Sequence, residues 1–440
     1  MNPPKEPHSK LENPLLFFSL RAIINQAKSS DFFSKILKTI STRISLIIIG
    51  FITSVIIART LGPEGRGMFA MAVTLGAFGI QFTNLGLHGS NTYYASRDAS
   101  LLSPLLGNSL ATSFTLGILT SLLAGLFFWI YPSLAPIHGT LLLMALTWVP
   151  FGLAYLLFQS LLLAVDDIRI YNRVELVTKI FYFGILGVII LFNQVTPETV
   201  FGGSLIALLI RFAWSYFSLS ARIHHTVTYS IKLFQKSMSY GIKSYFGSLF
   251  SFFLFKIDLL MINHMLGTKE AGYYDIAISL AVIVYLLPEV VSTILYPKLC
   301  SVEKTSEKWK IARQTGYWLA GIMLVICLLA GVLAKPAIGL LFGSAFLPSF
   351  LPFLILIICK YILTLNLIFN NFIVSIHIPW EVIPFSFFLV LLNIILNLLM
   401  IERYGMVGAA WATTISFGML TLFNVFYSYK YLSSNKKSDA

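Results

Sequence analysis

The sequence predicts an all-α integral membrane protein with about twelve transmembrane helices, in two parallel six-helix bundles around a central cavity. Three observations favour this fold class: an apolar composition, a series of long apolar runs, and a polar turn that occurs in both halves of the chain. Of the 440 residues, 57% are hydrophobic and only 11% are charged, and the mean hydropathy is +0.82. Soluble globular proteins carry roughly 25% charged residues, so lipid is the expected solvent.

Apolar runs bounded by charges, proline or glycine define the expected helices. A helix needs about 20 such residues to cross a hydrocarbon core of about 30 Å. The first six are expected near 40–58, 68–90, 107–131, 139–164, 171–192 and 199–219. The second six are expected near 240–265, 271–297, 314–334, 350–374, 380–401 and 407–431. These runs are too long for barrel strands and lack the alternation of apolar and polar positions that such strands show.

These runs divide the chain into five predicted segments. They are 1–39 (cytoplasmic arm), 40–219 (N-terminal bundle), 220–239 (cytoplasmic linker), 240–431 (C-terminal bundle) and 432–440 (cytoplasmic tail). The arm contains NPLLFFSLRAIINQA, which fits either an amphipathic helix at the membrane surface or an unstructured tether. It lacks a short apolar core followed by a small-residue cleavage site, so a cleaved signal peptide is not expected.

Lysine and arginine are distributed unequally between the two sides of the predicted membrane. With the N-terminus in the cytoplasm, the cytoplasmic segments and the helix ends beside them hold 21 of them, and the outside loops hold five. Cytoplasmic loops of membrane proteins carry such an excess, so both termini are expected to be cytoplasmic. The net charge of +13 then lies largely beside anionic lipid, and no nucleic-acid partner is expected.

A polar turn is repeated between the first two helices of each half. The stretch LGPEGRGMFA, which begins at Leu61, returns 205 residues later as LGTKEAGYYD. Both copies keep two glycines, Gly62 and Gly67 in the first and Gly267 and Gly272 in the second. Glycine adopts backbone conformations closed to other residues, so these positions are predicted to form tight turns. Because six helices separate the copies, the two halves form parallel repeats.

Five segments stand in order along the expected helices. They are ARTLGPEGRGMFAMAVTL, FQSLLLAVDDIRIYNRVE, FKIDLLMINHMLGTKEAGYYDIAISLAV, LFGSAFLPS and YGMVGAAWATTIS. Together they resemble the polysaccharide flippase family of the multidrug, oligosaccharidyl-lipid and polysaccharide exporter superfamily. The resemblance implies a V-shaped pair of bundles that moves a lipid-linked oligosaccharide, usually on undecaprenyl pyrophosphate, from the cytoplasmic to the outer leaflet.

That resemblance further implies a role in O-antigen (lipopolysaccharide), capsule or exopolysaccharide biosynthesis. The expected location is the cytoplasmic (inner) membrane of a bacterium. Besides membrane lipids and the lipid-linked glycan, the expected partners are a polysaccharide polymerase and glycosyltransferases of the same pathway.

Charged residues inside the apolar runs are the candidate functional residues, because each costs about 2.5–3.5 kcal/mol at the bilayer centre. The substrate-binding candidates are Lys256, Lys360, Arg211, Arg43 and Asp258. Cations suit the phosphates of a lipid carrier, since charge-assisted hydrogen bonds strengthen where water is scarce. The alternatives are an ion pair with another helix for Lys256 and Asp258 and snorkelling to the headgroups for the two arginines. The resembling family often has a functional arginine in its first helix, which favours Arg43.

Two further patterns involve carboxylates. Glu289 follows Pro288, and a proline removes a backbone hydrogen bond and bends a helix. A carboxylate at such a bend is a candidate for coupling to a proton or Na⁺ gradient, with pairing to a lysine of the same bundle as the alternative. Glu175 and Lys179 lie four residues apart, a spacing that favours a local ion pair.

Enzyme chemistry is not indicated. The sequence has no phosphate-binding G-x-x-x-x-G-K-[ST] loop and no metal-spaced histidines, and its three cysteines do not suggest a disulfide framework. No cofactor or metal is therefore expected. The alternatives to a glycan-lipid flippase are a multidrug or cation antiporter and a peptidoglycan-precursor flippase of the same superfamily, because fold alone leaves the substrate open.

Overall fold

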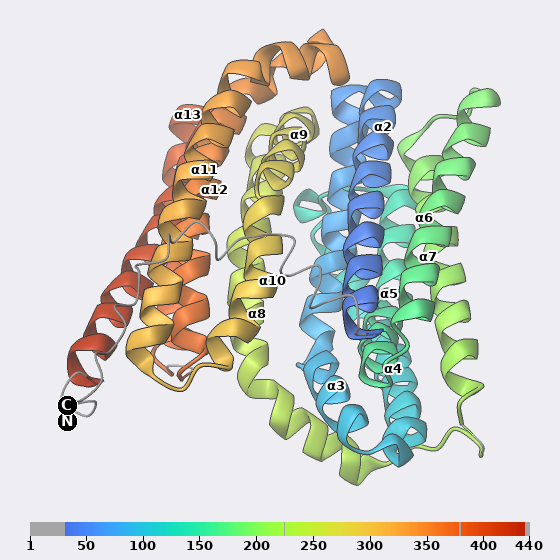
Figure 1. Cartoon of the computed structure of the whole chain (residues 1–440). Helices are drawn as coiled ribbons and strands as arrows, with labels where there is room; N and C mark the ends of the chain where they lie inside the picture. The colour runs from blue at the N-terminus through green and yellow to red at the C-terminus, as the bar shows by residue number, and fades with distance from the viewer. Residues whose placement is uncertain (1–30, 224, 378–379, 436–440) are drawn as a thin grey trace, which may run out of the picture.

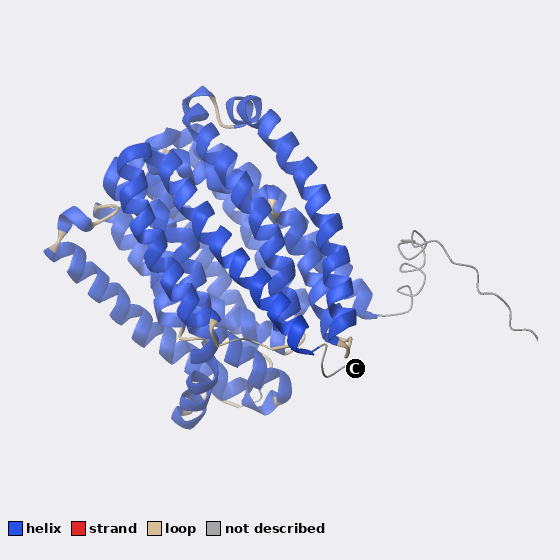
Figure 2. Ribbon diagram, turned by 90° about the vertical axis from the view of Figure 1, so that its left-hand side faces the viewer, coloured by secondary structure: helices blue, strands red, loops and turns tan. Residues whose placement is uncertain are grey.

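A computed structural model describes residues 31–223, 225–377 and 380–435, and it gives only the backbone of residues 31–44, 243 and 433–435. The N-terminal segment NPLLFFSLRAIINQA, expected as either an amphipathic helix or an unstructured tether, lies outside these ranges. The described chain consists of helices joined by short loops (Figure 2). This confirms the predicted fold class.

The first bundle begins with a long helix that reverses direction. Within α2, Gly62 has a φ of 69° and separates two arms, 31–61 and 63–84. Its remaining elements are short 3₁₀ turns, the 11-residue helix α3 and four helices long enough to cross a membrane. In order, the elements are α2 Asp31–Asn84, α3 Leu87–Arg97, η2 Ala99–Leu101, α4 Leu102–Ile130, η3 Pro132–Leu134, α5 Gly139–Ala164, α6 Ile168–Leu191 and α7 Pro197–Ser220.

The second bundle contains two breaks with clear backbone causes. Gly405, with a φ of 58°, separates two arms within α13. The pair α9 and α10 is bent by 44°, and Pro288 lies in the first turn of α10, where it cannot donate a backbone hydrogen bond. The elements are α8 Ile231–Leu266, α9 Thr268–Val284, α10 Leu286–Cys300, α11 Thr305–Leu341, η4 Ser344–Ser349, α12 Phe350–Val374 and α13 Val382–Asn435.

The helices account for the expected spans. Nine described helices are long and apolar enough to cross a membrane, and the bent pair raises this number to ten. Because α2 and α13 each contain two helices joined at a glycine, all twelve predicted spans have a counterpart. The expected boundaries 139–164 and 350–374 coincide with α5 and α12.

The two bundles lie side by side, with α2 to α7 on the right and α8 to α13 on the left of Figure 1. They meet where α2 packs on α9 and where α2 and α3 pack on α8. The largest buried core combines side chains of both bundles, such as Met71 and Phe201 from the first and Ile276 and Phe346 from the second. The bundles therefore share an apolar core near the repeated turn.

Candidate functional site

The repeated turn brings the two bundles into contact. Gly62 and Gly267 have φ values of 69° and 106°, in the region that favours glycine, and each reverses the chain between two helices. The second glycine of each copy has a different role, because Gly67 and Gly272 lie inside α2 and α9.

Gly67 and Gly272 permit close packing of one copy of the turn on the other. A Cβ atom at Gly67 would lie 1.8 Å from the Thr268 carbonyl oxygen, and one at Gly272 would lie 1.9 Å from the Pro63 carbonyl oxygen. The contact is reciprocal, because Thr268 and Pro63 follow the first glycine of their copies. Such an exchange is what a pseudo-two-fold axis between parallel repeats produces. Any larger side chain would force the bundles apart.

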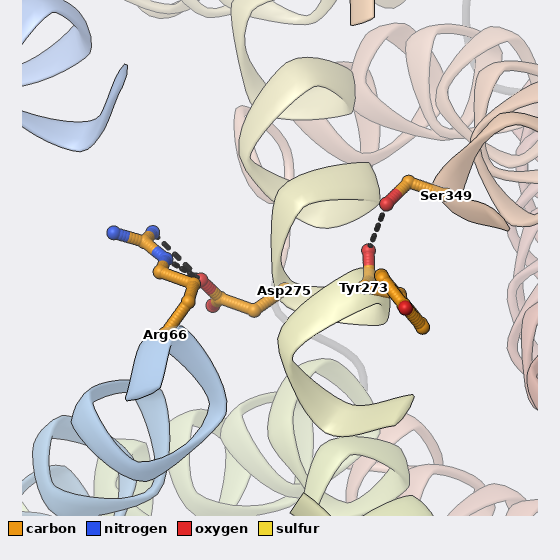
Figure 3. A network of polar contacts seen from close by, with 4 residues as sticks. All are labelled: Arg66, Tyr273, Asp275 and Ser349. Carbon is orange, nitrogen blue, oxygen red and sulfur yellow. Dashed lines mark hydrogen bonds and ion pairs between the residues drawn. The ribbon is translucent and has the colours of Figure 1, made fainter. Parts of the chain in front are cut away.

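An ion pair also joins the two copies of the turn. Arg66 of α2 reaches Asp275 of α9, with Nε and Nη2 at 2.8 and 2.6 Å from one carboxylate oxygen, and Arg66 is only 6% exposed (Figure 3). On the far side of α9, the Ser349 hydroxyl donates to the Tyr273 carbonyl at 2.8 Å. We call Pro63, Arg66, Gly67, Thr268, Gly272 and Asp275 the hinge seam. Sequence reasoning missed the ion pair, because no local pattern links residues 209 positions apart.

A second contact joins the bundles at the other end of α2. A Cβ atom at Gly86 would lie 2.2 Å from the Gly241 carbonyl oxygen, so α3 and α8 also approach closely. The Tyr245 hydroxyl donates to the Phe82 carbonyl at 3.1 Å across the same interface. The second arm of α2 is therefore held against the C-terminal bundle at both ends.

An apolar groove lies beside the first arm of α2. It has a volume of about 620 Å³. Its lining includes Ile47 and Phe51 of α2, Leu280 of α9, Val290 of α10 and Leu333 of α11, so it runs between the bundles. A groove with such a lining suits a hydrocarbon chain rather than a polar molecule.

The C-terminal bundle contains a sealed carboxylate. Asp258 is 2% exposed and accepts hydrogen bonds from the Tyr274 hydroxyl at 2.6 Å and the Thr413 hydroxyl at 3.0 Å. These partners come from α9 and α13, and both occur in segments on which the family resemblance rests. The backbone amide of Leu259 donates to the other carboxylate oxygen. Since buried carboxylates need such donors, this arrangement stabilises the position of Asp258.

Lys360 of α12 lies close to this carboxylate without forming an ion pair with it. The Lys360 ammonium stands over the rings of Phe255 and Tyr285, 5.3 and 5.2 Å from their centroids, and the side chain is 9% exposed. A cavity of about 30 Å³ is lined by Asp258, Lys360 and Thr413 among others, which is room for about one water-sized species. We call Asp258, Tyr274, Lys360 and Thr413 the C-bundle cluster.

The N-terminal bundle contains a second charged cluster, between α5, α6 and α7. Glu175 accepts hydrogen bonds from the Tyr155 hydroxyl, at 2.6 Å, and from the Gln159 amide. Arg211 donates from Nε to the Thr178 hydroxyl at 2.8 Å, and its guanidinium lies over the Tyr155 ring. We call this the N-bundle cluster; its members are Tyr155, Gln159, Glu175, Thr178, Lys179 and Arg211.

The remaining predicted residues are less enclosed. Lys256 is half-buried and forms no hydrogen bond or ion pair with the described residues, and it lies on a different face from Asp258, as its spacing predicts. Glu289 is exposed in the first turn of α10, where its charge acts on Lys360 and Tyr285. The backbone of Arg43 belongs to α2, and its side chain is outside the described part.

The expected local ion pair in the first bundle is absent. Glu175 and Lys179 do lie close enough for their charges to interact. However, the carboxylate is held by Tyr155 and Gln159 from α5 instead of by the lysine of its own helix. Tertiary packing thus replaces the local partner that the spacing predicted.

Two bundles of membrane-spanning helices, joined at a seam and with charged clusters inside the spans, define a multi-pass membrane protein of the two-bundle transporter fold. Comparison with known proteins identifies the family of the chain. It belongs to the family described as polysaccharide biosynthesis protein, which it matches over residues 56–351.

A curated relative is the probable low-salt glycan biosynthesis flippase Agl15 of Haloferax volcanii. It is 24% identical over 291 residues, which cover 64% of this chain and 61% of the relative. The matched region thus spans about three fifths of that relative's length.

Solved structures show the same fold. An inward-facing multidrug resistance MATE family transporter of the MOP superfamily has a TM-score of 0.75 at 10% identity, over 90% of this chain and 96% of that chain. The lipid II flippase MurJ, in an inward closed conformation, has a TM-score of 0.68 at 15% identity, over 90% and 87%. The relatives described here are named as flippases or transporters, in line with the prediction that the chain is not an enzyme.

Proposed function

We propose that this protein is a flippase that moves a polyprenyl-pyrophosphate-linked oligosaccharide across the cytoplasmic membrane for cell-surface polysaccharide biosynthesis. The family membership and the name of the glycan biosynthesis relative support a glycan-lipid substrate. The O-antigen, capsule and exopolysaccharide pathways are the proposed destinations. A polymerase and glycosyltransferases of the same pathway are the proposed partners, and both termini are proposed to face the cytoplasm of a bacterium.

The observation that carries this proposal is the unpaired cation of the C-terminal bundle. Lys360 is nine-tenths buried and rests on two aromatic rings, and no carboxylate of the described chain lies within ion-pair distance of it. Cation–π contacts contribute about 2 kcal/mol or more in a desolvated site, and a charge-assisted hydrogen bond to an anion would add to that stabilisation. A ligand with a phosphate would supply that anion.

The groove between the bundles gives the lipid a route. A polyprenyl chain lying in the apolar groove beside Ile47 and Phe51 stays in hydrocarbon, while its pyrophosphate reaches the charged interior. Only the head group and sugars then need to cross between the bundles. This division avoids exposing the lipid tail to water.

Alternating access requires the bundles to rock about their shared contacts. The seam is the proposed closed gate at the outer end, because it combines backbone contact with the Arg66–Asp275 ion pair. Opening there would expose both charges to water, which limits the free-energy cost of separating them.

Glu289, at the bend of α9 and α10, is the proposed site at which a proton or Na⁺ resets the conformation. Its charge acts on Lys360, so its neutralisation would change how strongly Lys360 attracts a phosphate.

Mass spectrometry of polyprenyl-linked glycans in a strain that lacks the gene tests the function. Leaflet location would be probed with an impermeant sugar-binding reagent. We expect one repeat unit to accumulate on its lipid carrier, confined to the cytoplasmic leaflet. An unchanged pool together with new sensitivity to cationic dyes would contradict the flippase and favour the drug antiporter. Accumulation of the peptidoglycan precursor would instead favour a peptidoglycan-precursor flippase.

A further inference from the structure

The apolar groove has a counterpart in the other half of the repeat. The apolar groove is lined by the first arm of α2 together with α9, α10 and α11. A pocket of about 450 Å³ is lined by α8 together with the second arm of α2, the end of α4, the chain that follows α4, and α13. In the repeat, α8 corresponds to the first arm of α2, the second arm of α2 to α9, and α4 to α11. The two spaces therefore occupy equivalent positions between the bundles.

This pocket, unlike the apolar groove, carries uncharged polar groups at its end near the hinge seam. We call it the seam pocket, and its lining includes Leu75, Phe128, Ser133, Asn263, His264 and Leu398. Among the described residues that line it, none is lysine, arginine, aspartate or glutamate. Ser133 and His264 are exposed, and their side chains form no hydrogen bond with described residues. A phosphate would find no permanent positive charge here, so the lining favours a neutral polar ligand.

The carboxamide of Asn263 has a fixed orientation and an unused acceptor. Its Nδ2 donates to the Pro136 carbonyl at 3.1 Å, from one bundle to the other. Its Oδ1 is covered by neighbouring atoms and accepts no hydrogen bond from described residues. A buried acceptor without a donor is costly. Because phosphate oxygens are themselves acceptors, the missing partner is a donor such as a hydroxyl.

The bond between Asn263 and Pro136 also has a counterpart in the repeat. At the end of the first arm of α2, Arg59 donates from Nε to the Leu341 carbonyl at 2.6 Å, at the end of α11. In both halves, the first helix is thus bonded to the end of the third helix or to the chain just after it. Parting of the bundles at this end would break both bonds. The Asn263 amide would then be free to donate and to accept.

We infer that the seam pocket is a subsite for a sugar residue of the glycan, which it binds when the bundles part at the outer end. A sugar ring carries hydroxyls that donate and accept hydrogen bonds, and its C–H faces pack on apolar side chains. Asn263 is the main partner of the hydroxyls, and Phe128 offers an aromatic surface to a ring face. Small-molecule pockets measure about 300–1,000 Å³, and the seam pocket lies in that range. The inference rests on the proposed function, since the sugar belongs to the lipid-linked glycan.

The two equivalent spaces would then hold different parts of one substrate. The apolar groove suits the hydrocarbon chain, whereas the seam pocket suits an uncharged sugar. The seam pocket should therefore contribute to the affinity for glycan-bearing lipids and not to the affinity for the bare lipid carrier.

The test compares the binding of two lipids to the purified full-length protein in lipid nanodiscs. One is undecaprenyl pyrophosphate, and the other is the glycan-bearing polyprenyl lipid extracted from the strain that lacks the gene. We expect the wild type to bind the glycan-bearing lipid more tightly. Asn263→Leu removes both amide groups and should weaken that binding about tenfold, with no change for undecaprenyl pyrophosphate.

A second variant keeps the Asn263 amide and its bond to Pro136 in place. Leu398→Trp puts a larger side chain at the exposed edge of the pocket and should also weaken binding of the glycan-bearing lipid alone. Leu399→Trp is the matched control, because Leu399 is similarly exposed on α13 and does not line the pocket. This variant should bind both lipids as the wild type does.

Three results would count against the subsite. A preference for the glycan-bearing lipid that persists unchanged in both Asn263→Leu and Leu398→Trp would overturn it and leave the proposed function intact. Equal binding of the two lipids by the wild type would also overturn it, because no sugar then contributes to affinity. A wild type that binds neither lipid would contradict the proposed function as well.

Discussion

In each bundle a tyrosine hydroxyl donates a hydrogen bond of 2.6 Å to a carboxylate, Tyr155 to Glu175 in the first and Tyr274 to Asp258 in the second. The surroundings differ. Asp258 is 2% exposed and receives further bonds from Thr413 and a backbone amide, whereas Glu175 is half-buried. The same bond therefore serves a sealed site in one bundle and an accessible site in the other.

The cations differ in the same way. Lys360 is nine-tenths buried over two aromatic rings, whereas Lys179 and Arg211 are half-buried. This contrast suggests different roles for the two clusters. In the C-bundle cluster, the hydrogen bonds of Asp258 stabilise the fold and Lys360 supplies one buried charge. The N-bundle cluster offers a more accessible charged surface.

Removing the carboxylate should destabilise the protein more in the C-bundle cluster than in the N-bundle cluster. Asp258→Ala leaves the hydroxyls of Tyr274 and Thr413 buried without an acceptor, and each such group costs about 1–3 kcal/mol. We expect a loss of about 2–4 kcal/mol, measured as a lower midpoint of thermal unfolding in detergent. Glu175→Ala should cost about 1 kcal/mol, because it leaves one buried donor, the Tyr155 hydroxyl, without its acceptor, whereas the half-buried Gln159 amide can bond to water.

Asp258→Asn is the control for that comparison. Because it keeps an acceptor oxygen, its unfolding midpoint should lie between those of the wild type and Asp258→Ala. If Glu175→Ala destabilises the protein more than Asp258→Ala does, the contrast between a sealed and an accessible cluster is wrong.

Neutralising Lys360 should reduce glycan export without lowering the stability of the protein. Replacing a buried charge with an apolar side chain of similar volume is often neutral or stabilising. We therefore expect Lys360→Met to keep the unfolding midpoint of the wild type and to reduce glycan export about tenfold or more. Lys256→Met, on the half-buried face of α8, is the matched comparison and should reduce export less. Normal export by Lys360→Met at wild-type protein levels would remove Lys360 from the proposed site.

The ion pair of the hinge seam should contribute a smaller free energy than the buried hydrogen bonds of Asp258 do. A double-mutant cycle of Arg66→Ala and Asp275→Ala isolates their interaction, and we expect a coupling free energy of about 1 kcal/mol for this largely buried ion pair. Glu64→Ala, an exposed change in the same turn, provides the control. Additive effects of the two seam variants would show that the ion pair does not hold the bundles together.

The sequence predicted the elements of the fold and missed the partners of the charged residues. The spans 139–164 and 350–374 were predictable because each is a long, mostly apolar run with a polar loop at both ends. The bend of α9 and α10 followed from Pro288, since a missing donor has a local effect. Local causes of this kind can be read from a single chain.

The charged clusters depend on tertiary contacts, which one sequence does not reveal. Tyr274 and Thr413 were present in the recognised segments, yet nothing in their spacing indicated that both would bind Asp258, 16 and 155 residues away. Glu175 had a suitable lysine four residues along its helix and is held by another helix instead. Candidate residues could therefore be chosen by their cost in a membrane, while their partners could not.

We propose that charges inside the spans carry the phosphate head group of a glycan lipid between leaflets. The most direct measurement is transport of a fluorescent polyprenyl-pyrophosphate-linked oligosaccharide by purified protein in sealed proteoliposomes, with leaflet location read by an impermeant quencher. We predict that the wild-type protein moves the lipid. A variant with Lys360→Met, Lys179→Gln and Arg211→Gln together should fall to the rate of protein-free vesicles. Equal transport by the wild type and this folded variant would contradict the account.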